Sequence, residues 1–335
     1  MRFKFSVVIP TYKRPELLRN CLNCLLNQDL DRNEFEVLVV CDGPDPATAA
    51  LVKKFGGNFH CLQLHTRQGP AAARNLGWKN ANAQLIAFTD DDCLPDKHWL
   101  NAYWENYAGE DLKVMTGRVI VPIDEPITDY KKNIANLETA DFITANCCCS
   151  KDALELVGGF DERYRMAWRE DSDLEFKFLQ HEIHIDYKVE ASIIHPVRAT
   201  RWGVSLREQK KSMYNALLYQ RFPEIYRRKM TDAIPVIFYL MAAATVGLIV
   251  GLTLNHSAAI WVSVLTWIAC YASFSYRRIK NTSKHSEHVI EMLITSAIIP
   301  YLSLYWNYYG WWKFRNVSAS SVRTHASSPA RSGQY

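Results

Sequence analysis

The chain has 335 residues, of which 48% are hydrophobic and 22% are charged, and its formal net charge is +4. This length suits a large domain with an appendage, and the composition is that of a globular protein with apolar additions. So small a net charge gives no reason to expect nucleic acid as a partner. Nine cysteines, with no secretory signal peptide, predict reduced thiols in a cytosolic environment.

The first part of the chain alternates predicted strands and helices. Apolar runs rich in β-branched residues end at turn residues, and the segments between them carry apolar residues at helical spacing. This alternation predicts an α/β domain with a mostly parallel, doubly wound sheet. The expected strands are 5–9, 35–40, 59–64 and 85–89, and the expected helices are 16–27, 47–55 and 71–80.

From 97 to 195 the pattern becomes mixed, and we interpret this segment as the second half of the same domain. Residues 204–221 then form one amphipathic helical pattern, in which Arg207, Lys210 and Lys211 share a face. That face is either solvated or touches membrane phosphates or a substrate pyrophosphate. The mixed segment contains expected helices at 97–106, 151–157 and 171–180, and expected strands at 114–121, 142–149 and 183–194.

The C-terminal third predicts a membrane hairpin. Ile234–Leu254 has no charged residue over 21 positions, and Ala258–Phe274 has none over 17. Segments of this length and polarity are typical of membrane spans. Lysines and arginines flank the pair on both outer sides, but the turn between the two segments carries none. The positive-inside rule therefore places the N-terminal domain on the cytoplasmic side of the inner membrane.

A third apolar stretch, 289–309, ends in a Tyr- and Trp-rich run. We expect it to lie in the membrane interface, with a third span as the alternative. The domain organisation that follows is a catalytic domain over 1–230, a multi-pass membrane region over 231–312 with helices near 234–254, 258–275 and 289–309, and a tail over 313–335. The tail is Ser-, Ala- and Arg-rich from Val317 and is expected to be disordered.

Three consecutive carboxylates, Asp90, Asp91 and Asp92, follow the expected strand 85–89. Adjacent negative charges repel each other, and a hard divalent cation offsets that repulsion. Open α/β sheets also bind their ligands at the carboxyl ends of their strands. The alternative is an acidic, solvated turn in which an aspartate caps the next helix. The run alone leaves both interpretations open, and the motifs around it favour a ligand site that includes a metal ion.

Motifs at the ends of successive strands resemble glycosyltransferase family 2 of the membrane-attached bacterial type. They are PTYKRPE (10–16), VVCDGPD (39–45), GPAAARNLG (69–77) and FTDDDCLPD (88–96). VGGFDERY (157–164) and WREDSDLEFK (168–177) resemble the acceptor half of that family. The resemblance covers residues 3–230. It implies a glycosyltransferase A-type fold, which is Rossmann-like, followed here by the transmembrane or interfacial helices.

By this resemblance, one group of residues holds a nucleotide-sugar donor such as a UDP-sugar. Thr11 and Tyr12 would lie against the base, and Asp42 would accept a hydrogen bond from the imide N–H of a pyrimidine. Arg74 would face phosphate or brace the aspartates, with a plain surface salt bridge as the alternative. Asp90 would contact the ribose or the sugar, and Asp91 belongs to the same donor-binding group.

The resemblance also implies a metal site and a general base. Asp92 would ligate Mg²⁺ or Mn²⁺, and His195 is a further metal or diphosphate contact or else a structural histidine. In the pair Glu170-Asp171, Asp171 would deprotonate the acceptor hydroxyl, with helix capping by Asp171 or Asp173 as the alternative. Trp168 and Asp173 complete the acceptor side.

The predicted function is an inverting glycosyltransferase of the hexosyltransferase type, assisted by a divalent metal. Its acceptor is expected to be a lipid-linked saccharide or a cell-surface glycan, which places it in polysaccharide biosynthesis at the cell envelope. Transfer to polyprenyl phosphate is the nearest alternative. More distant alternatives are a sugar nucleotidylyltransferase, whose glycine-rich N-terminal loop is missing here, and an inactive membrane scaffold. A processive synthase motif is incomplete, because Arg198 stands where that motif has glutamine.

Overall fold

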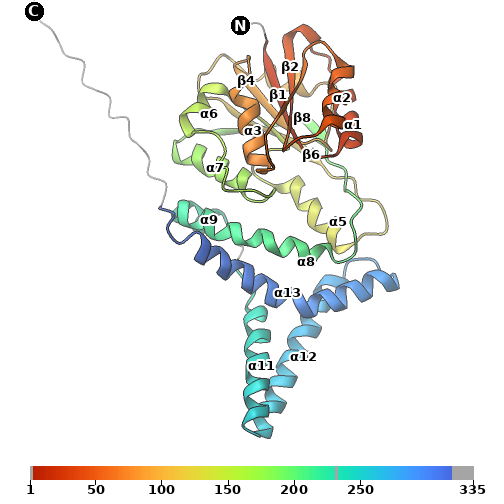
Figure 1. Cartoon of the computed structure of the whole chain (residues 1–335), viewed down its shortest axis with the longest axis vertical. Helices are drawn as coiled ribbons and strands as arrows, with labels where there is room; N and C mark the ends of the chain where they lie inside the picture. The colour runs from red at the N-terminus through yellow and green to blue at the C-terminus, as the bar shows by residue number, and fades with distance from the viewer. Residues whose placement is uncertain (1–2, 231–232, 319–335) are drawn as a thin grey trace, which may run out of the picture.

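A mixed sheet of eight strands forms the centre of the N-terminal domain in the computed structural model, which describes residues 3–230 and 233–318 (Figure 1). The strand order is β3-β2-β1-β4-β7-β6-β8-β5. Pairing is parallel from β3 to β4, antiparallel on both sides of β7, parallel between β6 and β8, and antiparallel between β8 and β5. The predicted α/β class, with its mixed second half, is confirmed. The strands are β1 Phe5–Thr11, β2 Phe35–Cys41, β3 Phe59–Gln63, β4 Leu85–Thr89, β5 Leu94–Pro95, β6 Val114–Ile120, β7 Asn146–Ser150 and β8 Ile185–Ile194.

Two apolar layers cover the sheet, because successive strand residues point to opposite faces. Val7 and Ile9 belong to one cluster of buried residues, and Val8 belongs to the other. The first layer includes α1, α2 and α4, and the second includes α3, α6 and α7. The helices of the domain are α1 Pro15–Leu26, α2 Pro46–Phe55, α3 Pro70–Lys79, α4 Trp99–Trp104, α5 Asp129–Ile134, α6 Lys151–Val157 and α7 Glu170–Gln180.

The pairing directions bring the carboxyl ends of six strands to one edge of the sheet. The strands β1 to β4 run in the same direction, and two antiparallel steps through β7 return β6 and β8 to that direction. The segments that follow β1, β2, β4 and β8 therefore meet at this edge. Those segments carry the predicted donor, metal and histidine positions.

Asn146, at the start of β7, connects the strands β6 and β8 through its side chain. It is fully buried, and its Oδ1 accepts from Trp99 Nε1 at 2.7 Å and from the Tyr103 hydroxyl at 2.8 Å. Its Nδ2 donates to the carbonyl oxygens of Arg118 and Ala191 at 2.9 and 2.8 Å. A fully satisfied buried amide rigidifies its surroundings. This one fixes β6 against β8, where the register shifts at Gly117/Arg118.

The segment predicted as one helix over 204–221 is divided, and we correct that prediction. It consists of α8 Val204–Glu208, the 3₁₀ turn Gln209–Ser212 and α9 Met213–Arg221, followed by α10 Pro223–Lys229. No proline or glycine explains the break. It coincides with the closest approach of a later helix, since a Cβ on Gly310 would lie 2.3 Å from the Met213 carbonyl oxygen.

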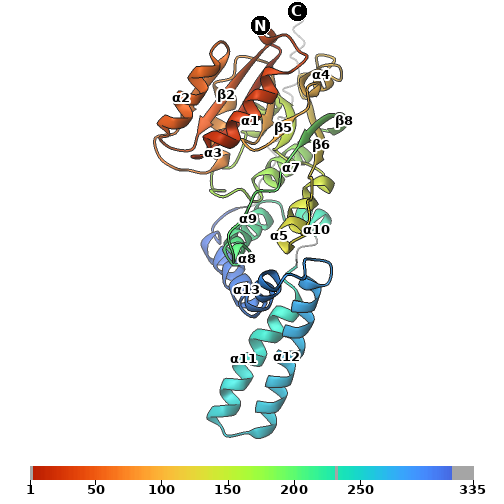
Figure 2. The same ribbon diagram turned by 90° about the vertical axis from the view of Figure 1, so that its right-hand side faces the viewer.

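Two long helices form a hairpin that projects from the catalytic domain (Figure 2). They are α11 Val236–Thr253 and α12 Ser257–Ile279, and their apolar side chains are largely exposed. Small residues allow close contact between them: a Cβ on Gly247 would lie 2.6 Å from Ser263 Oγ, and one on Gly251 would lie 3.0 Å from Ile260. This glycine spacing is typical of helices that pack within a bilayer.

The third apolar stretch is one continuous helix, α13 Ser286–Lys313, which passes through Pro300. It runs across the base of the catalytic domain beside α8 and α9, at a steep angle to the hairpin (Figure 1). Among residues 3–230 and 233–318, three helices, α11, α12 and α13, are long and apolar enough to cross a membrane. The orientation of α13 favours our interfacial interpretation, which stays a prediction. The predicted domain boundary at 230/231 adjoins residues 231–232, and most of the predicted tail, 319–335, also lies outside the described residues.

Candidate active site

The aspartate run lies where β4 ends, and its three carboxylates have different partners. Arg74, on α3, donates to Asp90 Oδ1 at 2.7 Å and to Glu170 Oε1 at 3.2 Å. Arg74 is only 2% exposed, so the alternative of a surface salt bridge is wrong. Burial disfavours the charge of Asp90, but Arg74 and His195 hold the pKa of its carboxyl below the usual value. Arg74 therefore joins the aspartate run to the start of α7.

Asp91 points into the domain. Its Oδ2 accepts from the Thr11 hydroxyl at 2.6 Å and lies 3.1 Å from Arg14 Nε. Burial raises the pKa of Asp91 to about 6, although Arg14 and Thr11 act in the opposite direction. Thr11 and Asp91, both predicted to bind the donor, thus bind each other through their side chains. Their contribution here is to fix the end of β1 against the end of β4.

Asp92 and His195 come together from the ends of β4 and β8. Ligand atoms of Asp92, Cys93 and His195 lie within 4.8 Å of one another. Among the described residues, Asp92 Oδ1 and His195 Nδ1 are buried and have no hydrogen-bond partner. Buried polar atoms rarely stay unpaired, carboxylate oxygen suits Mg²⁺ and Mn²⁺, and imidazole nitrogen is a common ligand of divalent transition metals, so the two residues fit a divalent cation. Burial raises the pKa of the Cys93 thiol far above its usual value, which makes it a poor ligand.

Arg198 is a contact that the sequence did not predict. It follows β8 and pairs through Nε with Asp92 Oδ2. From the sequence we used the segment HPVR (195–198) only for His195 and for the position where the processive motif has glutamine. The signal that could have predicted the contact is the arginine three residues after the histidine. It places a positive charge where a diphosphate would need one.

Tyr12 and Asp42 lie beyond the ends of β1 and β2. The Arg67 guanidinium lies 4.2 Å from the centroid of the half-buried Tyr12 ring. Asp42 Oδ1 accepts from the Gln68 and Gly69 backbone N–H groups at 2.6 and 3.0 Å. Asp42 therefore holds the loop that leads into α3. The stacking role of Tyr12 and the base-reading role of Asp42 stay predictions.

Glu170 and Asp171 begin α7, beside the aspartate run. The N-cap position is Arg169, which is in the left-handed region at φ 72° and makes no side-chain cap, so neither Asp171 nor Asp173 caps this helix. Asp171 is half-buried, and among the described residues its Oδ1 accepts a hydrogen bond from the Ser172 N–H, at 2.7 Å. Burial raises the pKa of Asp171. Burial and then the Asp171 charge raise the pKa of Glu170 to about 7. Both shifts make these carboxylates better proton acceptors.

Trp168 and Asp173, predicted together on the acceptor side, lie in different surroundings. Trp168 is 39% exposed, and its Nε1 donates to Asn215 at 3.2 Å. Asp173 is fully buried and contacts the Tyr164 hydroxyl at 3.3 Å, Arg221 at 3.2 Å and Lys177 at 3.5 Å. We correct the assignment of Asp173. On a helix, a residue two positions after Asp171 leaves from a different face, and here that face packs into the domain.

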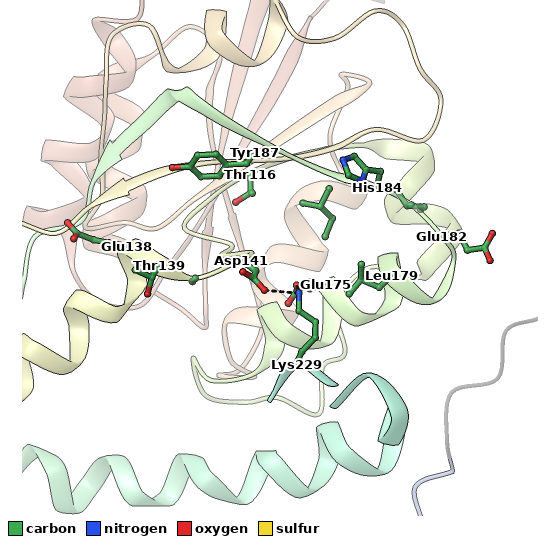
Figure 3. A pocket seen from close by; sticks show the side chains of 13 residues that line it. Thr116, Glu138, Thr139, Asp141, Glu175, Leu179, Glu182, His184, Tyr187 and Lys229 are labelled. Carbon is green, nitrogen blue, oxygen red and sulfur yellow. Dashed lines mark hydrogen bonds and ion pairs between the residues drawn. The ribbon is translucent and has the colours of Figure 1, made fainter. Parts of the chain in front are cut away.

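A cavity of about 650 Å³ opens beside α7 and contains none of the predicted donor, metal or base residues (Figure 3). Of the residues that line it, Glu175 lies on α7, one helical turn after Asp171. Lys229, the last residue of α10, bridges Glu175 and Asp141, with 2.9 Å to Asp141 Oδ2. These ion pairs hold the C-terminal end of α10 against α7 and the segment that contains Asp141.

The sheet and this edge define a glycosyltransferase A-type domain. Residues 6–161 match the family model described as glycosyl transferase family 2, so the chain carries a glycosyltransferase family 2 domain, as its motifs predicted. Glycosyltransferase AglE of Haloferax volcanii is 28% identical over 167 residues, 46% of this chain and 55% of AglE. The poly(ribitol-phosphate) β-N-acetylglucosaminyltransferase TarS of Staphylococcus aureus is 37% identical over 100 residues, 29% of this chain and 18% of TarS. The chain thus aligns with only part of each relative.

Solved structures show the same fold at low sequence identity. S. aureus TarS residues 1–349 superpose with a TM-score of 0.52 at 17% identity, covering 93% of this chain and 91% of that one. Mannosyltransferase PcManGT from Pyrobaculum calidifontis, solved with GDP-mannose and Mn²⁺, gives 0.53 at 17% identity, covering 93% and 88%. The predicted fold class and the assignment to a family of glycosyltransferases are confirmed.

Proposed function

We propose that the chain is an inverting glycosyltransferase that moves a sugar from a nucleotide-diphosphate donor to a lipid-linked saccharide or cell-surface glycan. One observation carries the proposal: Arg74 bonds both Asp90 and Glu170, which brings the donor edge of the sheet and the candidate base into one site. An inactive scaffold would have no need to keep Asp92 beside His195, or to keep Glu170, the neighbour of Asp171, bonded to Arg74.

In this mechanism Asp171 takes the proton of the acceptor hydroxyl. The acceptor oxygen forms a bond to the anomeric carbon on the side opposite the bond to the diphosphate, which breaks at the same time. The anomeric configuration therefore inverts. Asp92 and His195 would hold Mg²⁺ or Mn²⁺, which when bound neutralises charge on the departing diphosphate. Arg198 supplies a further positive charge at that place.

Purified protein incubated with a panel of nucleotide sugars tests the activity. One donor should be hydrolysed slowly by water and should be transferred faster when membrane lipid extract is added. NMR of the product should show the anomeric configuration opposite to that of the donor. Retention would contradict the single-displacement mechanism, and no turnover of any donor would contradict the proposed function.

The proposed location is the inner membrane, with the catalytic domain in the cytoplasm. The support is the charge pattern: Arg277, in the last turn of α12, and Lys280 lie at the domain end of the hairpin, whereas the turn 254–256 has no Lys or Arg. His256 and Asn281, at the two ends, are both exposed.

Single cysteines placed at these two positions, in a background without the native cysteines, should differ in their accessibility to a thiol reagent that does not cross the membrane. His256→Cys should react with an impermeant thiol reagent added to intact cells, because the turn faces outward. Asn281→Cys should react only after the cells are opened. The reverse pattern would place the site away from cytosolic nucleotide sugars and would refute the proposed topology.

A further inference from the structure

A second cavity, of about 460 Å³, lies where the membrane helices meet the catalytic domain. Its walls come from α5, from the segment 200–209 and from α11, α12 and α13. Arg278 of α12 ties these parts together, since it donates to Asp129 at 2.8 Å and to Thr295 Oγ1 at 2.7 Å. The Gly203 N–H also donates to Glu291 at 2.7 Å. Hydrogen bonds between the membrane helices and the catalytic domain therefore hold the walls of the cavity in place.

The cavity is close to the metal and diphosphate end of the site. Arg198 bonds Asp92, and Arg201, three residues later, lines the cavity. Three residues of chain span at most about 11 Å. Tyr130 lines the cavity too, and burial together with the charge of Asp92 raises its pKa, although nearby Arg198 lowers it. A molecule in the cavity would therefore lie beside the donor phosphates.

Two basic side chains that line the cavity have nitrogen atoms without a partner among the described residues. His288 is 8% exposed, and its Nε2 is buried with no hydrogen bond among the described residues. The exposed guanidinium of Arg201 makes no ion pair with any described residue. Of the other charged residues that line the cavity, Arg278 pairs with Asp129, Glu208 pairs with Lys211, and Glu291 accepts a hydrogen bond from the Gly203 N–H. A free guanidinium and an unpaired imidazole suit a phosphate oxygen.

The remaining wall is apolar and belongs to the membrane helices. Phe238 of α11, Phe274 of α12, and Met292 and Ile299 of α13 line it. Within the described part of the chain, these three helices are long and apolar enough to cross a bilayer. The cavity thus offers polar groups on the side of the catalytic domain and an apolar surface on the side of the membrane. A ligand with a phosphate head and a hydrocarbon chain matches both.

We propose that this junction cavity binds the lipid carrier of the acceptor, with its phosphate at Arg201 and His288 and the first part of its chain against Phe238 and Phe274. The inference rests on the proposed function, because it assumes a membrane-borne acceptor. It explains how a lipid-linked substrate is presented beside Asp92. The carrier's phosphate, and not the transferred sugar, is what the cavity recognises.

Binding by the full-length chain in nanodiscs, without donor, tests the proposal. The probes are a radiolabelled polyprenyl phosphate and, as competitors, the unphosphorylated polyprenol, phosphatidic acid and inorganic phosphate. Arg201→Gln should weaken polyprenyl phosphate binding roughly 10- to 100-fold, the equivalent of one charge-assisted contact. His288→Leu should also weaken it. The matched control is Arg277→Gln: Arg277 is an exposed arginine in the last turn of α12, and it does not line the cavity. It should bind like the wild type.

Each outcome decides the matter. Equal loss in Arg201→Gln and Arg277→Gln, or equal competition by phosphatidic acid, would show a general anionic-lipid surface and overturn the proposal. Equal competition by inorganic phosphate would show an anion site only, and would overturn it as well. Nucleoside diphosphate binding measured on each variant reports folding. If polyprenyl phosphate binds in a way that depends on Arg201, but no sugar is transferred to any lipid, the proposed function is refuted and the proposed lipid site stands. If the protein transfers sugar to a lipid and Arg201→Gln does not change polyprenyl phosphate binding, the proposed function stands and only the proposed lipid site is refuted.

Discussion

Asp171→Asn is expected to lower turnover by roughly 10²- to 10⁴-fold while leaving donor binding nearly intact, because an amide does not take the acceptor proton. In the native enzyme the rate should fall as pH is lowered through the pKa of Asp171. Burial raises that pKa, so the ionised, active form is lost at higher pH than for a free aspartate. Turnover and nucleotide affinity, measured separately across pH, check both statements.

Asp173→Asn is the matched control, two residues away. Asp173 is fully buried between Tyr164, Lys177 and Arg221. Its neutralisation should cost about 3 kcal/mol of stability, because the buried Lys177 ammonium loses its carboxylate, whereas Arg221 keeps its ion pair with Asp161. The folded fraction should retain its turnover number. Near wild-type turnover in Asp171→Asn would place the base elsewhere, with Glu170 as the next candidate.

The second large effect concerns the metal. Chelation should abolish transfer, and Mg²⁺ or Mn²⁺ should restore it. Asp92→Asn should weaken Mn²⁺-dependent binding of UDP or GDP at least about 10-fold, since it removes a formal charge from the candidate ligand set. Calorimetry with and without Mn²⁺ measures this without turnover.

The control for the metal is Asp96→Asn, the same substitution in the same motif. Asp96 is exposed and accepts from the His98 N–H at 2.9 Å, away from the cluster of Asp92 and His195. It should bind Mn²⁺ and nucleotide like the wild type. Undiminished binding by Asp92→Asn, or full activity in EDTA, would refute the metal assignment.

The sequence by itself determined the fold class and the order of the elements. The β-branched runs that became β1, β2 and β4 and the helical spacing that became α1, α2 and α3 are local patterns, and local patterns carry secondary structure. The same holds for the two uncharged stretches that became α11 and α12. The end of the strand 85–89 also predicted that the aspartate run lies at the ligand-binding edge of the sheet, whereas His195 was suggested only by the family resemblance.

Only the tertiary structure decided which way each of those side chains points and what it meets. Asp90, Asp91 and Asp92 are identical in type and adjacent in sequence, yet they face Arg74, Thr11 and Arg198 respectively. The separation of Asp171 from Asp173 and the junction cavity between α5 and α13 likewise depend on contacts between residues far apart in the chain. Such contacts follow from how elements pack, and no local pattern of residues encodes them.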